Sequence, residues 1–373
     1  MKILSAVINN IETDQRVDKV CYSLLKFGYN IELIGTTLRG KPTLNKPYKT
    51  SLIPLKYEDS FKLYAEFNLK LFFRLLKTTD RNTILLANDL DSLLPFYLVS
   101  KIKNRPLVFD SHEIFSELPS LQNKPKIKLF WKTLERFLLP KITYFYTVSN
   151  GYANWFKENY NVNPVVIRNV PILNRNTEIV SEFSLPPIES NNKIILYQGA
   201  LNISRGLEYA IKAMPMVKNA VLWIVGNGPI KKDLEQLVNT LNLTHRVFFL
   251  GHVTPAVLKQ ITPLADLGIS LEEDLGISYK YALPNKVFDY FQAGVPLLAT
   301  YLPEIKATVL KYKVGRVIKT HNEQHIANEI NILLTEGKQK YKDNLLIASK
   351  ECCWENEENK LQAIFNQISA AVR

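Results

Sequence analysis

Residues 282–296 read ALPNKVFDYFQAGVP, and this stretch predicts a helix that leads directly into a buried strand. We expect Asn285 as the N-cap of the helix and Gly294 as its C-terminal stop, because short polar residues and glycine are favoured at those two positions. The apolar run 297–300 then follows as a strand. Alternating helices and strands of this kind build parallel α/β sheets.

The first turn of this helix carries side chains suited to a nucleotide. Lys286 lies where free backbone N–H groups also point, so a diphosphate would meet a cation and several donors together. Asp289 falls on the same face one turn later, where a carboxylate can accept two hydrogen bonds from a ribose diol. Structural caps alone do not require a lysine and an acid on one face. The pattern therefore favours a binding site formed by Asn285, Lys286 and Asp289.

The alternation of short apolar runs and helical patterns extends in both directions from this stretch. Two series of strand–helix units, separated by a break, predict two doubly wound parallel sheets, in which ligands bind beyond the carboxyl ends of the strands. The predicted strands are 3–8, 31–34, 83–87, 107–109 and 144–148 in the first series, and 194–197, 221–225, 247–250, 267–271 and 297–300 in the second. The predicted helices of the first series lie near 14–27, 60–78, 91–103, 125–139 and 150–159.

The break between the two series is rich in Asn, Ser, Glu and Pro, which is typical of a linker. We therefore expect an N-terminal Rossmann-like domain over 1–172, a linker over 173–192 and a C-terminal Rossmann-like domain over 193–350. The remaining residues, 351–373, are helical without a strand partner and are a candidate to pack across the domain boundary. The ligand site is expected in a cleft between the two sheets.

Composition narrows the class of protein. The 373 residues are 46% hydrophobic and 22% charged, as in folded globular proteins, and no window approaches 18 uncharged apolar residues. The three cysteines have no metal or disulfide spacing, which favours a reducing cytoplasmic compartment. The net charge of +12 is concentrated in residues 1–175, with 26 Lys and Arg against 15 Asp and Glu. That half would attract an anionic membrane surface, a phosphate-bearing acceptor or nucleic acid.

Two segments of the basic half mix cations with apolar residues. In 61–77 the charges recur every four residues, and a core helix with a solvated stripe is the favoured interpretation. In 124–132, cations alternate with aromatic residues, and a core helix and a membrane-surface helix remain equally open. Peripheral attachment at the inner face of the plasma membrane is therefore one candidate location.

Glycines follow two strands of the second series. Gly199 comes directly after the first of these strands, and the Gly226-Asn227-Gly228 turn follows the next. Glycines at such turns allow a diphosphate to approach the backbone, and Arg205 opens the helix after the first turn. An ordinary strand–helix turn and a solvated arginine are the alternatives. The turn after the first strand of the chain has no glycine, which argues against an NAD-type site at the N-terminus, and the absence of a P-loop motif argues against a P-loop NTPase.

His112 and a D-x-D string are the other candidates for chemistry. His112 follows a strand and is flanked by Asp110 and Glu113, which favours a catalytic over a purely structural histidine. Asp89 and Asp91 resemble a metal-binding string, but they open a helix, so capping is the favoured interpretation and no metal is predicted.

These motifs together resemble the family-4 glycosyltransferases of bacterial type. The C-terminal resemblance covers about 190–316, and the N-terminal half fits through an opening D-x-R-V motif and two strand-end motifs. The residues that carry it are Gly199…Arg205-Gly206-Leu207, Val225-Gly226-Asn227-Gly228-Pro229, Leu250-Gly251-His252-Val253, the block 284–296, Asp14-Gln15-Arg16-Val17, Phe109-Asp110-Ser111-His112-Glu113 and Thr147-Val148-Ser149.

The resemblance implies a GT-B fold, with two Rossmann-like domains facing a cleft, the acceptor in the N-terminal domain and the nucleotide sugar in the C-terminal domain. It implies a retaining transfer in which Arg205 and Lys286 hold the diphosphate, Asp289 the ribose, and His112 faces the donor sugar. His112, Arg205 and Lys286 are the expected catalytic residues. The expected donor-binding residues are Gly199, Arg205, Gly226, Asn227, Gly228, Glu273, Asn285, Lys286 and Asp289. The expected acceptor-binding residues are Asn10, Asp14, Arg16 and Glu113.

The chain departs from the family pattern at two positions. The family usually has E-x7-E ending at the position of Asp289, but Tyr281 replaces the first glutamate, which normally grips the donor hexose. Three acids in the preceding loop, Glu272, Glu273 and Asp274, are candidates to compensate. A basic residue usually follows the first glycine, and here Ala200 stands there.

The expected function is a metal-independent glycosyltransferase without a bound cofactor, acting on a glycan or lipid-linked glycan in surface polysaccharide synthesis. A nucleotide-sugar epimerase on the same fold is one alternative, and a non-catalytic partner subunit is another. Nucleic-acid binding is disfavoured because no recognition motif occurs.

Overall fold

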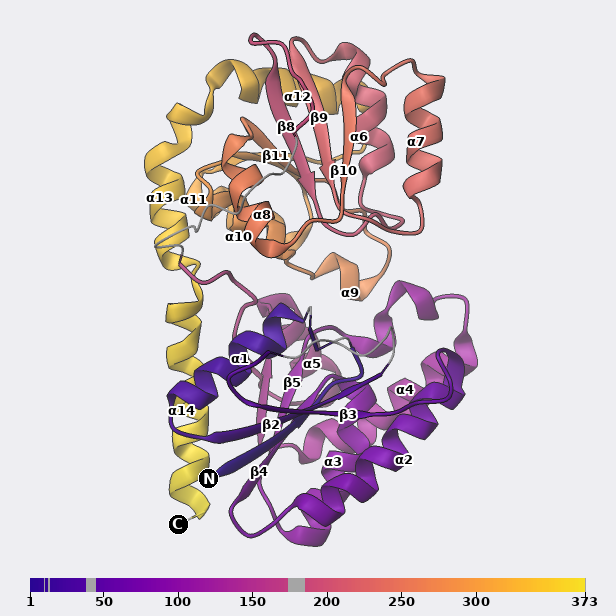
Figure 1. The fold of residues 1–373 in the computed structure, drawn as a ribbon, viewed down its shortest axis with the longest axis vertical. Helices are drawn as coiled ribbons and strands as arrows, with labels where there is room; N and C mark the ends of the chain where they lie inside the picture. Colours follow the sequence, from indigo (N-terminus) through magenta and orange to yellow (C-terminus); the bar gives the residue numbers. More distant parts are fainter. Residues whose placement is uncertain (10, 13, 38–44, 174–184, 373) are drawn as a thin grey trace. The chain divides into compact units, whose positions relative to one another are not determined.

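The computed structural model describes residues 1–9, 11–12, 14–37, 45–173 and 185–372. The chain forms two compact units (Figure 1). Unit 1 comprises Met1–Asn169 and Glu357–Arg373, and unit 2 comprises Val170–Asn356. The linker predicted over 173–192 falls largely on 174–184, which lie outside the described residues.

Unit 1 contains a parallel sheet in the order β3-β2-β1-β4-β5-β6-β7 within its described residues. Figure 1 shows α1 and α14 on one side of it and α2, α3 and α4 on the other. The strands are β1 (Lys2–Ala6), β2 (Asn30–Thr36), β3 (Lys49–Ile53), β4 (Thr83–Asn88), β5 (Leu107–Ser111), β6 (Tyr144–Thr147) and β7 (Val165–Val166). The helices are α1 (Gln15–Lys26), α2 (Ser60–Thr78), α3 (Leu90–Lys103), α4 (Pro125–Leu138), α5 (Asn150–Tyr160) and α14 (Trp354–Val372).

Unit 2 contains a second parallel sheet, in the order β10-β9-β8-β11-β12-β13 within its described residues. Its strands are β8 (Lys193–Gln198), β9 (Ala220–Val225), β10 (Val247–Gly251), β11 (Leu267–Ser270), β12 (Leu297–Thr300) and β13 (Gly315–Ile318). Its helices are α6 (Leu207–Ala213), α7 (Lys231–Thr240), α8 (Pro255–Ile261), α9 (Ile277–Lys280), α10 (Asn285–Gln292), α11 (Pro303–Tyr312), α12 (Glu323–Glu336) and α13 (Lys342–Glu351).

Central strands are buried on both faces, which explains their almost continuous apolar sequences. All six residues of β4 and all six of β9 are buried. The ten predicted strands are all present. The structure adds β3, β7 and β13, which lie at or near sheet edges and are mostly half-exposed, so their sequences lack a strong apolar run.

From Glu357 onward the C-terminal helix belongs to unit 1. The Lys26 ammonium on α1 lies 2.9 Å from a carboxylate oxygen of Glu358 on α14, and the Tyr29 hydroxyl donates to the Phe365 carbonyl. In the described part of the chain, no helix has both the length and the apolar character needed to cross a bilayer.

Candidate active site

Two glycine turns lie at the carboxyl ends of β8 and β9 and pack against each other. Gly199 and Gly226 have φ of +137° and +141°, which favour glycine. A Cβ atom on Gly226 would lie 1.9 Å from the carbonyl oxygen of Gly199, and one on Gly228 would lie 2.3 Å from the carbonyl oxygen of Leu201. The Asn227 side chain accepts a hydrogen bond from the Gly228 amide. Close backbone packing at this edge of the sheet therefore requires glycine at positions 226 and 228, whereas at position 199 the positive φ favours it.

Lys286 occupies the first turn of α10, beside the Gly199 turn. Its side chain is 7% exposed, its ammonium lies 3.9 Å above the Tyr197 ring, and it is 2.9 Å from Oε1 of Glu272. A Cβ atom on Gly199 would lie 3.7 Å from the ammonium nitrogen. The predicted N-cap is wrong, because α10 begins at Asn285 itself and Pro284 stands in the capping position. The Asn285 side chain is exposed.

Glu272 connects the two predicted donor-site cations. Its Oε1 atom lies 2.9 Å from the Lys286 ammonium and 3.8 Å from the Arg205 guanidinium, and its other oxygen accepts from the Ser270 hydroxyl. Burial raises the pKa of Glu272, but Lys286, Ser270 and Arg205 together outweigh burial and hold that pKa below its usual value. Of the three compensating acids suggested by the sequence, Glu272 is the one that contacts both cations.

Asp289 is oriented by the end of β8. Its carboxylate accepts a hydrogen bond of 3.0 Å from the Gln198 amide, and the Gln198 oxygen accepts from the Thr262 hydroxyl. Glu273 lies apart from this chain of contacts, where it accepts a hydrogen bond from the Tyr209 hydroxyl, and its backbone amide donates to the Ser204 carbonyl.

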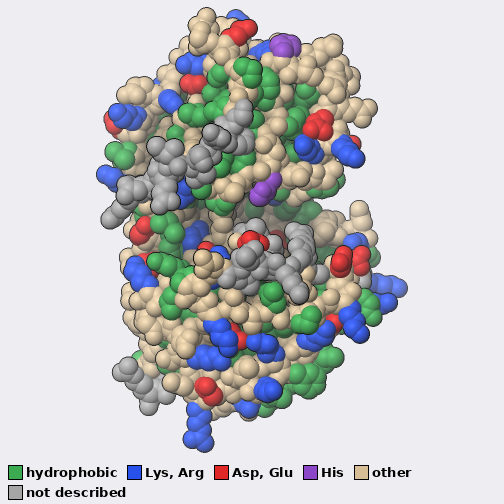
Figure 2. Space-filling model, viewed as in Figure 1, with side chains coloured by type: hydrophobic (Ala, Val, Ile, Leu, Met, Phe, Trp, Pro, Cys, Tyr) green, Lys and Arg blue, Asp and Glu red, His purple; other side chains and the backbone are tan. Residues whose placement is uncertain are grey.

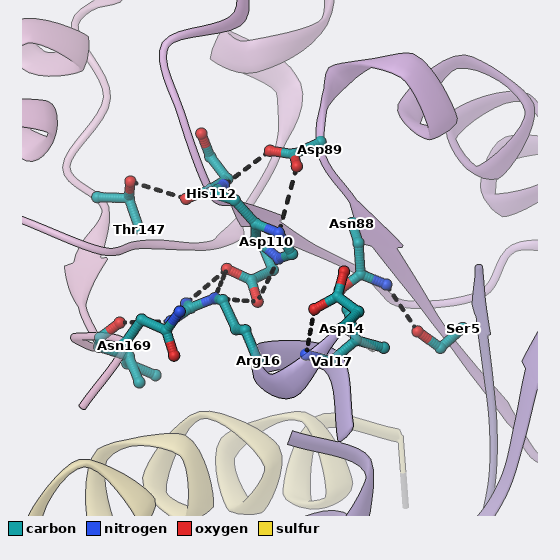
Figure 3. Close-up of polar contacts among 12 residues, drawn as sticks. Ser5, Asp14, Arg16, Val17, Asn88, Asp89, Asp110, His112, Thr147 and Asn169 are labelled. Carbon is teal, nitrogen blue, oxygen red and sulfur yellow. Dashed lines mark hydrogen bonds and ion pairs between the residues drawn. The ribbon is translucent and has the colours of Figure 1, made fainter. Parts of the chain in front are cut away.

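A second polar cluster lies at the carboxyl end of β5 in unit 1 (Figure 3). The His112 ring lies between two carboxylates, with Nδ1 3.2 Å from Asp89 and Nε2 3.2 Å from Asp110. Burial lowers the pKa of His112, but Asp89 and Asp110 outweigh it and raise the pKa to about 9. His112 is therefore an imidazolium cation at neutral pH. Burial, with Asp89 next, raises the pKa of the adjacent Glu113 carboxyl to about 7.

Arg16 is a buried partner of this cluster and does not face solvent. Its guanidinium is 3% exposed, lies 2.7 Å from Asp110 and donates to the Ile167 carbonyl. We therefore correct its predicted acceptor-binding role to a buried partner of Asp110. Asp14 accepts from the Val17 amide as the N-cap of α1. Asn10 lies outside the described residues.

The capping role predicted for Asp89 is also wrong. Asp89 precedes α3 with φ of +56°, and its side chain makes no cap hydrogen bond. Its carboxylate accepts a 2.7 Å hydrogen bond from the backbone amide of His112 and contacts the His112 ring. Asp91 is buried in the first turn of α3. Asp89, the first acid of the D-x-D string, is therefore part of the His112 cluster.

Comparison with known proteins gives a family match for part of the chain and a fold match for the whole of it. Residues 182–346 match the family model described as glycosyl transferases group 1. The match covers less than half of the 373 residues. It contains both glycine turns, Arg205, Glu272 and α10, so the donor-site residues predicted in unit 2 all lie inside the matched domain.

Curated relatives match over parts of their length. An uncharacterized glycosyltransferase of Methanocaldococcus jannaschii is 30% identical over 40% of this chain and 37% of that protein. A chitobiosyldiphosphodolichol beta-mannosyltransferase of Debaryomyces hansenii is 27% identical over 46% and 35%. A lipopolysaccharide core biosynthesis glycosyltransferase of Rhizobium meliloti is 29% identical over 34% and 38%. The chain thus spans little more than a third of the length of these relatives.

Solved structures match the whole chain in fold. Sucrose-phosphate synthase of Thermosynechococcus elongatus has a TM-score of 0.81 at 16% identity and covers 100% of both chains. Anabaena HepE in complex with UDP and glucose has a TM-score of 0.74 at 16% identity, covering 98% of this chain and 100% of that one. The predicted fold class, two Rossmann-like parallel-sheet domains of the GT-B type, is confirmed.

Sequence reasoning missed the supporting residues at both clusters. Tyr197 and Gln198 end a buried strand and read as core, although they contact Lys286 and Asp289. Asp110 lies in β5, whereas Asp89 follows β4, so no local motif joined Asp89 to His112. The position of Asp89 directly after a buried strand was the available signal, because strand ends in parallel sheets converge.

Proposed function

We propose that this protein is a glycosyltransferase that moves a sugar from a nucleotide-sugar donor to a hydroxyl group of an acceptor. The observation that carries the proposal is the pairing of Lys286 and Arg205 around Glu272, beside the Gly199 turn. Nζ of Lys286 and Oε1 of Glu272 form an ion pair, but within the described residues neither atom makes a hydrogen bond of good geometry. Buried polar atoms are normally hydrogen-bonded, so the Lys286 ammonium is left able to donate to a ligand.

In this proposal a bound diphosphate replaces Glu272 as the partner of Lys286 and Arg205. Arg205, Lys286 and the N–H groups at the start of α10 would stabilise the negative charge that develops on the leaving diphosphate. Asp289, oriented by Gln198, would accept hydrogen bonds from the ribose. These groups supply positive charge without a metal, so we propose a metal-independent reaction, with retention of configuration as the resemblance implies.

We propose that His112 acts through its positive charge, because both ring nitrogens face carboxylates. Asp89 and Asp110 keep its ring protonated at neutral pH, which disfavours a role as general base. Glu113 and Asp14 remain the proposed acceptor contacts among the described residues.

The proposed acceptor is a glycan or a lipid-linked glycan in surface polysaccharide synthesis. Its support is the similarity to relatives named for a diphosphodolichol-linked substrate and for lipopolysaccharide core synthesis. An anionic membrane surface is the proposed partner of unit 1.

A thermal-shift panel of UDP-, GDP-, ADP- and dTDP-sugars tests the donor site. Ligands that bind the folded state raise its melting temperature, so we expect one nucleotide class to raise it and Lys286→Ala to lose that shift. Lys342 is exposed in unit 2, so Lys342→Ala is the matched control and should keep the nucleotide-induced shift. No shift with any member would overturn the proposal in favour of a non-catalytic subunit. Turnover of the donor without acceptor would instead indicate an epimerase.

A further inference from the structure

The exposed side of α4 carries an apolar stripe formed by Ile127, Phe130, Leu134 and Phe137. These residues recur at spacings of three and four, so they share one face of the helix. A helix of a globular protein normally turns such a face to the core, but Ile127, Phe130 and Phe137 are 40%, 43% and 56% exposed. The buried positions of α4 are Trp131, Glu135 and Leu138.

The α4 stripe continues onto the two neighbouring helices of unit 1. Phe61 on α2 is 58% exposed, and its ring meets that of Phe130 edge-on, with 5.5 Å between the ring centroids. Tyr97 on α3 meets the ring of Phe137 at 6.4 Å, and Ile102 on the same helix is 60% exposed. Exposed aromatic and aliphatic side chains from three helices therefore belong to one connected surface, and surfaces of this kind mark interaction sites.

Positive charge surrounds this surface. Residues 90–141 contain nine Lys and Arg and five Asp and Glu. All five acids are buried or half-buried, whereas six of the cations, including Lys124, Lys126 and Arg136, are exposed. Glu117 forms ion pairs with Lys128 and Lys132. It therefore does not neutralise the other two cations of α4, Lys126 and Arg136. Figure 2 shows Lys and Arg side chains lying among hydrophobic ones over unit 1.

A basic hollow, formed by Tyr97, Lys101, Arg105, Lys141 and Tyr144, lies at the C-terminal end of the α4 stripe. The ammonium groups of Lys101 and Lys141 lie 5.5 and 5.9 Å from the centroid of the Tyr97 ring. The Lys141 ammonium also lies 3.2 Å from the centroid of the Phe137 ring. Arg105 donates to backbone carbonyls. It also contributes to the lowered pKa of Asp80, of which the Thr83 hydrogen bond is the main cause.

The basic hollow is separate from the candidate active site. Leu107, the first residue of β5, lines the hollow, whereas the His112 cluster lies beyond the last residue of the same strand. Parallel strands place their amino and carboxyl ends at opposite edges of a sheet. The hollow and the α4 stripe therefore form a second surface with its own ligand chemistry.

We propose that this surface docks on an anionic phospholipid bilayer, with the α4 stripe among the headgroups and a lipid phosphate in the basic hollow. A helix with apolar residues on one face and flanking cations binds membranes by this combination. A second copy of the chain is disfavoured as the occupant, because a symmetric contact would bring the same cations together. The inference rests on unit 1 alone and does not depend on the proposed function.

Co-sedimentation of the full chain with vesicles tests the proposal. The vesicles are pure phosphatidylcholine or phosphatidylcholine mixed with phosphatidylglycerol, at low and high salt. We expect binding to the mixed vesicles only. Each cation near an anionic surface raises the affinity roughly fivefold. The double variant Lys101→Ala/Lys141→Ala should therefore bind about thirtyfold more weakly. Phe130→Ser/Phe137→Ser should remove the salt-resistant part of the binding, and thermal melts check that both variants fold.

Lys342→Ala/Leu346→Ser provides the matched control, because it removes one exposed cation and one exposed apolar side chain from unit 2. It should bind vesicles as the unaltered chain does. Equal binding to neutral and anionic vesicles, or equal loss in the control and the unit 1 variants, would overturn the proposal. Binding of single-stranded RNA that the unit 1 lysine variant abolishes, without vesicle binding, would assign the surface to nucleic acid and also overturn it.

Discussion

The ammonium of Lys286 lies 2.9 Å from Oε1 of Glu272, and both side chains are more than nine-tenths buried. Neither atom makes a hydrogen bond of good geometry within the described residues. A buried ion pair recovers its desolvation cost only when further hydrogen bonds complete it. A diphosphate would provide acceptors for the Lys286 ammonium, which connects the stability of this site to its occupancy.

Replacing Lys286 by alanine should affect both stability and catalysis. The change leaves Glu272 buried without its partner, so we expect the free energy of unfolding to fall by about 3 kcal/mol. Loss of one charged group at the leaving diphosphate should lower kcat by roughly a hundredfold or more. Urea titration and steady-state kinetics measure the two effects.

The double variant Lys286→Met/Glu272→Gln separates the effect on stability from the effect on catalysis. It removes both charges, so it should recover most of the stability while remaining inactive. A double variant that recovers activity together with stability would show that Lys286 acts only in folding.

Replacing Asp289 by alanine should weaken nucleotide binding selectively. The carboxylate is expected to contact the ribose, and a hydrogen bond to a charged group contributes enough that its loss should cost about tenfold in affinity. Inorganic pyrophosphate lacks the ribose and should bind unchanged. Calorimetric titration of both ligands measures this, with Asp343→Ala as an exposed acidic control. Equal weakening of pyrophosphate and nucleotide would argue against ribose recognition.

His112 predicts a pH dependence of stability. Its folded pKa, about 9, is higher than the unfolded value of about 6.5, so the folded state holds the proton more tightly. The resulting stabilisation is fully present below about pH 6.5 and is lost as the pH rises through about 9, by about 3 kcal/mol in total. The difference in unfolding free energy between the unaltered chain and His112→Gln should shrink over that window. A constant difference would show that His112 is not protonated in the folded protein.

The glycine turn offers a backbone prediction. Gly226→Ala places a methyl group against the Gly199 carbonyl, so it should displace the turn, destabilise the protein by about 2 kcal/mol and weaken donor binding. Gly251→Ala is the matched control, because Gly251 also has positive φ, +71°, but its Cβ would meet no atom within 4 Å. Thermal melts and nucleotide titration should show donor binding retained in the control. Loss of binding in both variants would indicate a general effect of backbone strain.

The sequence predicted the parallel strands because buried strands in such sheets are almost entirely apolar, as in β4 and β9. It also predicted the cation and the acid on α10, because helical spacing is a local property. The edge strand β13 was missed because Arg316 interrupts its short apolar run.

Contacts between distant residues could not be predicted in the same way. Arg16 and Asp110 are 94 positions apart, and a single sequence contains no signal that pairs them, so the arginine was assigned to the acceptor. Asp89 was assigned to a cap because its neighbour in sequence is a helix, whereas its neighbour in space is His112. The pairing of Glu272 with Lys286 and Arg205 likewise depends on how the loop after β11 folds back toward α10.

A crystal structure of the protein soaked with the nucleotide that gives the largest thermal shift would show where the diphosphate binds. We expect density for a diphosphate in contact with Lys286, Arg205 and the Gly199 turn, with the ribose against Asp289. Nucleotide density elsewhere, with those side chains still paired only to Glu272 and Gln198, would contradict this expectation.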